Sequence, residues 1–143
     1  MYIDAENRLS NAQAIAAVAS TNIIDFSSDR NMGIGEPLCL VVVVTTLLDG
    51  TTGDETYSVT MQTDDNAGFG SPTTIGGVVA LPRNSAVGTK FIIPIPPDTA
   101  MERYFRVLYG VGGTTPLGAV TTFLTSMKMV QNDVHYDDAI TVG

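Results

Sequence analysis

The sequence is poor in charged residues, in basic residues and in cysteine, and each shortage excludes a class of protein. Charged residues make up 15% of the 143 residues, and Lys and Arg number 7 against 15 Asp and Glu, which gives a net charge of −8. The basic residues are scattered, whereas binding to a phosphate backbone requires clustered cations. We therefore expect no binding to nucleic acid, and none to anionic membrane surfaces, which repel an acidic domain.

The single cysteine, Cys39, excludes an intrachain disulfide. It lies in the run LCLVVVVTTLL (38–48), and no histidine or basic residue is near it in sequence, so we interpret it as a small buried hydrophobic side chain rather than a reactive thiol. The run has 11 residues, and a membrane-spanning helix needs about 20, so it predicts a buried strand. No segment has the form of a secretion signal, so we expect the protein to stay in the cytoplasm where it is made.

What the sequence does contain is a series of β-branched runs bounded by Gly, Pro, Asn or Asp. Strands are predicted at 20–26, 38–48, 56–63, 73–81, 90–97, 103–111 and 119–130. Loops are predicted between them, among them 27–37, and a hairpin turn is predicted at 112–118. This spacing, without a convincing long helix, is typical of an antiparallel all-β sandwich, and we expect one domain over residues 1–143.

Local patterns predict how several of these strands lie. In TYSVTMQT (56–63) the apolar Tyr57, Val59 and Met61 alternate with polar residues, which predicts a strand with one buried face. In RYFRVLYGV (103–111) Phe105, Val107 and Tyr109 form one face, and the residues between them form the other. The glycine pair in TTIGGVVAL (73–81) predicts a β-bulge or a close approach. The prolines of KFIIPIPP (90–97) place that strand at an edge or at the end of a sheet.

The two ends of the chain are less regular. The segment SNAQAIAAVAS (10–20) could form a helix capped by Ser10, but its alternation of small and polar residues favours an extended arm over residues 1–20. The last residues, 131–143, read as a tail that could contain a strand.

No arrangement of residues points clearly to catalysis. The only histidine, His135, lies in NDVHYDD, where Asp133 and Asp137 could join it on one face as metal ligands; a solvated acidic tail is the interpretation we favour. The glycine-rich GVGGTT (110–115) lacks the Gly-Lys-Ser/Thr ending of a phosphate-binding loop. We expect no cofactor, no metal and no enzymatic activity.

Arg103 and Arg106 are charges in an otherwise apolar strand. Both could contact a partner protein, because Arg is enriched at interfaces. Both could equally protect a sheet edge, or pair with Glu102 and the acidic loops. The sequence leaves these alternatives open.

Three stretches resemble the small cement proteins of tailed-bacteriophage heads, the kind known from a Bordetella phage. They are MYIDAENRLSNAQAI (1–15), SVTMQTDDNAGFGSP (58–72) and ERYFRVLYGVGGTTPLGAVTTFL (102–124). The resemblance implies a jelly-roll-like fold and a virion protein that assembles in the host cytoplasm, binds the outer surface of the capsid and clamps neighbouring capsomers. The partners would be the major capsid protein and further copies of the chain, as a homodimer or homotrimer.

The resemblance also suggests residues for capsid or subunit contacts or for maintaining the fold: Tyr2, Ile3, Asn7, Arg8, Leu9, Arg103, Tyr104 and Arg106. It gives the arm a use, since an extended segment, loosely held until then, can add a strand to a neighbour. The alternatives are another phage or cell-surface binding module, such as a carbohydrate-binding sandwich, and a hydrolase that uses His135. The absence of Trp weakens the former.

Overall fold

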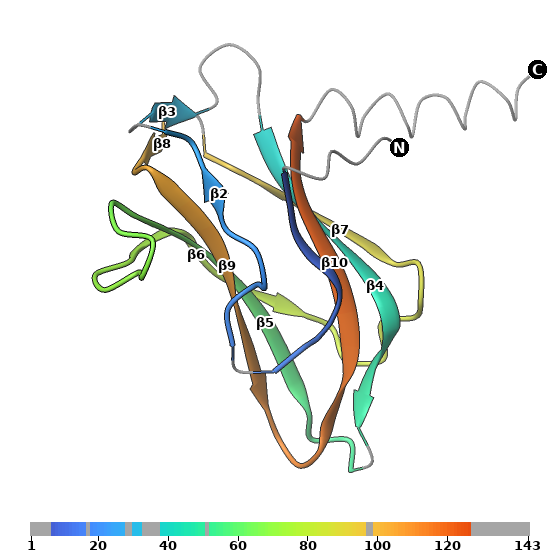
Figure 1. The fold of residues 1–143 in the computed structure, drawn as a ribbon. Helices are drawn as coiled ribbons and strands as arrows, with labels where there is room; N and C mark the ends of the chain where they lie inside the picture. The colour runs from blue at the N-terminus through green and yellow to red at the C-terminus, as the bar shows by residue number, and fades with distance from the viewer. Residues whose placement is uncertain are drawn as a thin grey trace, which may run out of the picture.

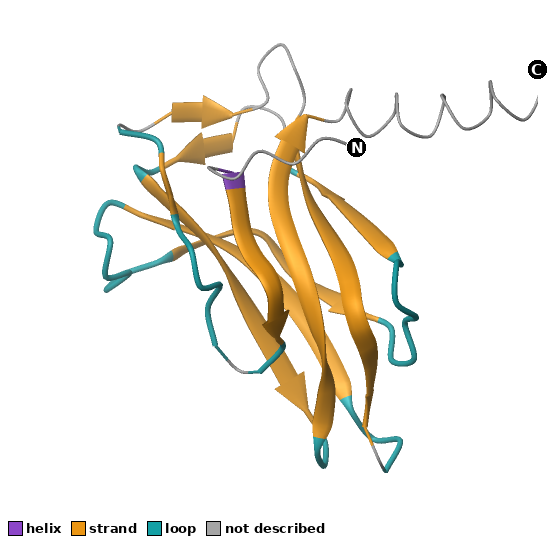
Figure 2. Cartoon of the chain, turned by 45° about the vertical axis from the view of Figure 1, so that its right-hand side comes forward, coloured by secondary structure: helices purple, strands orange, loops and turns teal. Residues whose placement is uncertain are grey.

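The structure is a computed structural model that describes residues 7–16, 18–27, 30–32, 38–50, 52–96 and 99–126. Nearly all of these residues lie in strands or in the loops that join them (Figure 2). The strands are β1 (Arg8–Ala14), β2 (Ile24–Asp25), β3 (Arg30–Met32), β4 (Leu38–Gly50), β5 (Thr56–Asp64), β6 (Thr73–Leu81), β7 (Lys90–Pro94), β8 (Thr99–Met101), β9 (Tyr104–Gly112) and β10 (Pro116–Ser126).

Two four-stranded antiparallel sheets form the sandwich (Figure 1). Sheet A has the order β1-β10-β4-β7, and sheet B has the order β2-β9-β5-β6. Apart from the β5–β6 pair, each successive strand of the two sheets crosses to the other sheet, which is the strand order of a jelly roll. The predicted all-β, jelly-roll-like sandwich is therefore confirmed.

The core lies between the inner faces of the two sheets. In β9 the alternation seen in the sequence places Phe105, Val107 and Tyr109 inside, with exposures of 1% or less. In β4 both faces of the first half are buried, since Leu40 and Val41 are both fully shielded from solvent. Burying each such side chain contributes about 1.5–3 kcal/mol, so these two strands are central to stability.

The start of the described chain is an integral strand of sheet A. Residues 8–14 are extended, as predicted, and they pair antiparallel with β10. The expectation of a loosely held arm is wrong for this part, because Leu9 is fully buried and Ile15 is 4% exposed. Leu9 reaches the core at a register shift between Arg8 and Ser10, a bulge that alternation of residue types did not reveal.

The glycine pair in β6 does form a bulge. Gly76 and Gly77 have φ angles of 73° and 89° and separate Ile75, opposite Met61, from Val78, opposite Thr60. A left-handed backbone of this kind is open to glycine at little cost. The prediction of β7 as an edge strand is also confirmed, since it ends the order of sheet A.

Two local predictions are wrong. The segment 27–37, predicted as a loop, contains β3, which pairs with β8 in a small two-stranded sheet. The turn after β9 is not a hairpin, because β9 belongs to sheet B and β10 to sheet A. Both features depend on pairing between distant segments, which local residue patterns do not encode. Among the described residues there is no helix that is both long and apolar enough to cross a membrane.

Candidate interaction surface

The residues suggested by the resemblance lie in different parts of the structure. Tyr2 and Ile3 lie outside the described residues. Asn7 directly precedes β1, and Arg8 begins it, opposite Phe123 of β10. Leu9 is fully buried in the core, so of the two roles suggested for it the structure supports maintenance of the fold.

Arg103 forms an ion pair with β2. Its Nε and one terminal nitrogen donate to the two carboxylate oxygens of Asp25 at 2.9 and 3.1 Å, and its guanidinium lies 5.0 Å from the centre of the Tyr104 ring. The hydrogen bond from Arg103 lowers the pKa of Asp25. Because nearly half of each side chain is exposed, the pair is accessible to a partner and contributes little to stability.

Arg106 lies on the other side of the sheet from the core, between β5 and the loop that follows β5. Its Nε donates to Oε1 of Gln62 at 2.9 Å, and its guanidinium lies 4.2 Å from the centre of the Phe69 ring. Phe69 is only 7% exposed, so the loop folds back onto this end of the sheet. Arg106 therefore holds this loop in place by stacking on Phe69, a contact that the sequence did not suggest beside the pairing with acidic loops that it left open.

Asp64 fixes the same loop from its beginning. Its carboxylate accepts hydrogen bonds from the backbone N–H groups of Ser71 at 2.8 Å and Asn66 at 3.1 Å. The hydrogen bond from Ser71, followed by that from Asn66, lowers the pKa of Asp64 despite burial. A charged carboxylate bound to backbone donors is a structural anchor at neutral pH.

The outer face of sheet B carries few charged side chains. Every second residue of β5 and β9, such as Val59 and Val107, points into the core, so the residues between them point outward. Neighbouring outward residues are small or uncharged across three strands: Ser58 and Thr60 in β5, Val78 and Ala80 in β6, and Leu108 and Gly110 in β9. Arg106, stacked on Phe69, marks one end of this set, which we call the sheet B face.

The side chains of the sheet B face are closely fitted to one another, and one edge of the face is exposed. Gly110 and Ser58 face each other so closely that a Cβ atom on residue 110 would lie 2.4 Å from the Ser58 hydroxyl oxygen. At its β6 edge Val78 is 70% exposed. A chain with a net charge of −8 thus presents a face without a carboxylate among its central residues. Depletion of charge is what distinguishes the centre of a protein–protein interface from other surface.

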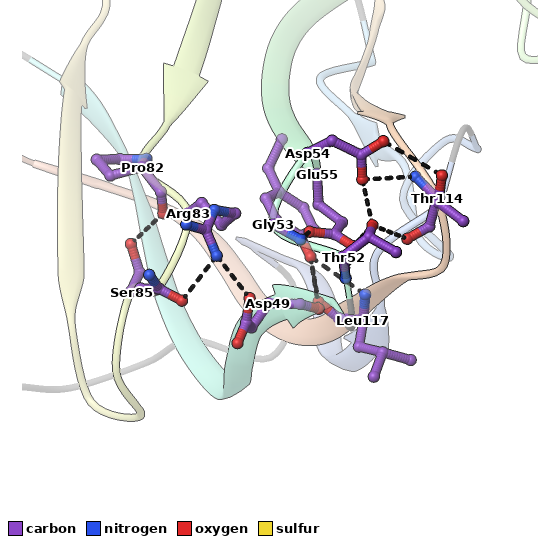
Figure 3. A network of polar contacts seen from close by, with 12 residues as sticks. Asp49, Thr52, Gly53, Asp54, Glu55, Pro82, Arg83, Ser85, Thr114 and Leu117 are labelled. Carbon is purple, nitrogen blue, oxygen red and sulfur yellow. Dashed lines mark hydrogen bonds and ion pairs between the residues drawn. The ribbon is translucent and has the colours of Figure 1, made fainter.

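At the opposite end of the sandwich, acidic side chains close two loops (Figure 3). The Asp54 carboxylate accepts a hydrogen bond from the Thr52 hydroxyl and another, at 3.1 Å, from the backbone N–H of Thr114. These hydrogen bonds lower the pKa of Asp54. Burial works to raise the pKa of Glu55, but hydrogen bonds from Thr52 and Gly53 outweigh it and the pKa is lowered. Asp54 therefore ties the loop 52–55 to Thr114, whereas Glu55 closes the loop 52–55 on itself.

Cys39 is fully buried, and this burial raises the pKa of its thiol to about 11. The interpretation of Cys39 as a small buried hydrophobic side chain is confirmed. In the described part of the chain, no three His, Cys, Asp or Glu side chains gather where a metal could bind. His135, Asp133 and Asp137 lie outside the described residues.

Comparison with known protein families finds a match over most of the chain. The sequence model of the Bbp16 family matches residues 9–124, a stretch that runs from β1 to β10 and includes Arg103, Tyr104 and Arg106. The family name denotes a protein of a Bordetella phage. No curated protein matches the chain.

Proposed function

The chain belongs to the Bbp16 family, which makes it a phage-associated protein, and on that premise we propose that it is a cement protein of the virion. It binds the outer surface of the phage head and holds neighbouring capsomers together. Its partners are the major capsid protein and further copies of itself, as a homodimer or homotrimer. Its activity is binding, without catalysis, cofactor or contact with nucleic acid or membrane.

The observation that carries the proposal is the sheet B face. A surface of small, uncharged side chains in an acidic protein suits packing against another folded protein. The exposed pair of Arg103 and Asp25 adds charged groups beside this sheet, where they would orient the contact rather than supply most of its affinity.

The lattice of a capsid strengthens such contacts. It repeats one binding site many times, and a symmetric oligomer that contacts several sites at once gains affinity through effective concentration. Each single contact can therefore be modest. This suits a 143-residue protein whose sheet faces are each only four strands wide.

A matched pair of variants tests the proposed surface. Val78 lies on the sheet B face and is 70% exposed, while Val87 lies in the loop before β7 and is 66% exposed. Val78→Glu is expected to reduce the amount of protein retained on phage heads, because it adds a desolvated charge to the contact. Val87→Glu, which adds the same charge at similar exposure, is expected to bind as the wild type does.

Location in the virion tests the wider proposal. Purified particles are separated into heads and tails, and the chain is quantified in each fraction by mass spectrometry. We expect it in the head fraction, and we expect an antibody against it to bind intact particles. Recovery only with tails, together with a specific hit on a glycan array, would replace the cement function by the alternative of a carbohydrate-binding module.

A further inference from the structure

The strand β6 forms an open edge of sheet B. It is the last strand in the order β2-β9-β5-β6, with β5 on its inner side. Of its nine residues, Ile75, Val79 and Leu81 are shielded from solvent at least in part, and the others are exposed. Val78 is 70% exposed, more than any other large hydrophobic side chain in the described part of the chain. The outer side of β6 is therefore accessible to another chain.

The half of β6 that follows its bulge offers backbone groups for a further strand. Residues 78–81 pair one for one with β5. In an antiparallel pair, alternate residues direct their N–H and C=O groups at the neighbouring strand, so the residues between them direct theirs away from β5. Pro82, which has no N–H, ends this run. Residues 78–81 thus present donors and acceptors at the open edge.

The other three edges of the two four-stranded sheets are protected against strand addition. β7 contains a lysine and ends in a proline, both of which discourage pairing at an edge. β2 has two residues, and one of them, Asp25, is held in the ion pair with Arg103. β1 is irregular and is bonded to the segment that follows it, since the N–H of Asn22 donates to the carbonyl oxygen of Leu9. β6, by contrast, contains no charged residue and no proline.

The charges around β6 favour a second copy of the chain as its partner. Two copies, each with a net charge of −8, repel each other, so they approach best through surface without carboxylates, and β6 is such a surface. At its start, Glu102 accepts a hydrogen bond from the Thr73 hydroxyl at 3.1 Å. Just beyond its end lies Arg83, whose guanidinium bonds Asp49 at 3.0 Å and has donors enough for a second carboxylate.

Antiparallel pairing of β6 with its copy brings these opposite charges together. In such a pair the end of one strand lies beside the start of the other. With a two-fold axis near Val78, Arg83 of one copy lies opposite Thr73 of the other, because positions 73 and 83 are equally far from position 78. The extra residue of the bulge alters this register by about one position, which the long arginine side chain can span. Arg83 of each copy then faces Glu102 of the other.

We propose that two copies of the chain join through β6, antiparallel about a two-fold axis, so that sheet B continues from one copy into the other. The contact uses the same residues on both copies, which closes the assembly at two. Antiparallel pairing keeps each face of a sheet on one side, so both sheet B faces lie on the same side of the dimer. This step rests on the proposed function: a dimer with two such faces can hold two neighbouring capsomers.

Opposite charges at position 78 test the contact in the protein alone, without phage heads. The dissociation constant of the dimer is measured by sedimentation equilibrium at up to about 1 mM protein, which populates even weak complexes. Val78→Glu and Val78→Lys should each weaken the dimer at least about tenfold, because like charges then meet across the axis. An equimolar mixture of the two variants should recover most of this loss. Val87→Glu is the control and should dimerise as the wild type does.

Four outcomes would overturn the inference: a wild type that stays monomeric over this range, a wild-type trimer, variants at position 78 that dimerise as the wild type does, and variants that show no recovery on mixing. Hydrogen exchange of the wild type gives a second measurement that needs no variant. The amides of residues 78–81 should exchange more slowly as the protein concentration rises, while those of β7 should not change. Equal behaviour of the two strands would also contradict the contact.

Co-sedimentation with stripped phage heads separates this inference from the proposed function. Dimers that do not bind heads would contradict the cement function and leave the β6 contact in place. Monomers that bind heads would contradict the β6 contact and leave the cement function in place.

Discussion

The phenolic oxygen of Tyr109 lies 2.6 Å from the hydroxyl oxygen of Ser10 and joins the two sheets through the middle of the core. The same oxygen lies 2.8 Å from the hydroxyl of Thr122, so one side chain of sheet B is bonded to two adjacent strands of sheet A. Burial raises the pKa of Tyr109, which keeps the phenol neutral as a donor. This bridge explains why β1, an edge strand, is held firmly against the rest of the sandwich.

Replacing Tyr109 by Phe should lower the free energy of unfolding by about 1–2 kcal/mol, since the Thr122 hydroxyl then lacks its partner in the core. The measurement is urea unfolding at neutral pH. Adding Thr122→Val to this variant removes the unpaired hydroxyl as well, so the double variant should recover part of the loss. Equal stability of wild type and Tyr109→Phe would mean that the bridge contributes nothing.

The turn between β9 and β10 requires glycine at position 113. Gly113 has a φ of 88°, and an added Cβ would lie 2.5 Å from the carbonyl oxygen of Asp54. Gly113→Ala should therefore cost well over the roughly 1 kcal/mol that a left-handed backbone alone imposes on alanine. Gly53→Ala is the control, because Gly53 has a φ of 83° with nothing within 4 Å of the added atom. Similar melting temperatures for the two variants would contradict the close approach.

Asp64 should make the domain sensitive to acid. Its pKa is lowered in the folded chain by the N–H groups of Ser71 and Asn66, so it binds a proton more readily when unfolded. Its stabilising contribution is present above its ordinary pKa of about 3.8 and is lost as the pH falls through the lower folded value. Asp64→Asn should reduce stability at pH 7 and lose less of it between pH 5 and pH 2. A variant with the wild-type acid dependence in urea unfolding would show that Asp64 is not the group concerned.

The variant Arg103→Ala distinguishes a role in contact with the capsid from a role in stability. The ion pair with Asp25 is solvent-exposed, so Arg103→Ala should leave the urea midpoint close to that of the wild type. A drop in retention on phage heads without a change in the midpoint would assign Arg103 to the contact with the capsid. A clear loss of stability would instead assign it to the attachment of β2.

Most of the strands could be predicted because their signals are local. The alternation of Phe105, Val107 and Tyr109 with polar or exposed positions and the glycine pair at 76–77 each specify a strand or a bulge from a few neighbouring residues. The jelly-roll order came from the resemblance, since β-branched runs do not say which strands pair. β3 was missed because RNM has no strand pattern of its own and is extended through pairing with β8.

Surface features that depend on contacts between residues distant in sequence could not be predicted either. The stacking of Arg106 on Phe69 joins β9 to a loop more than thirty positions earlier in the chain, and no spacing rule predicts it. The bulge that turns Leu9 into the core likewise depends on its partner strand β10. The sheet B face could in principle have been recognised, since its residues alternate with the core residues of β5 and β9.

The most direct test of the cement function is saturation binding to phage heads stripped of the protein. Purified protein is added in increasing amounts to heads taken before and after expansion, and the bound fraction is measured by co-sedimentation. The cement function predicts saturation at a fixed number of copies per capsomer, with Val87→Glu binding as the wild type does and Val78→Glu binding more weakly. Absence of binding to both forms of the head would contradict it and would leave the family resemblance as evidence of the fold and the phage association alone.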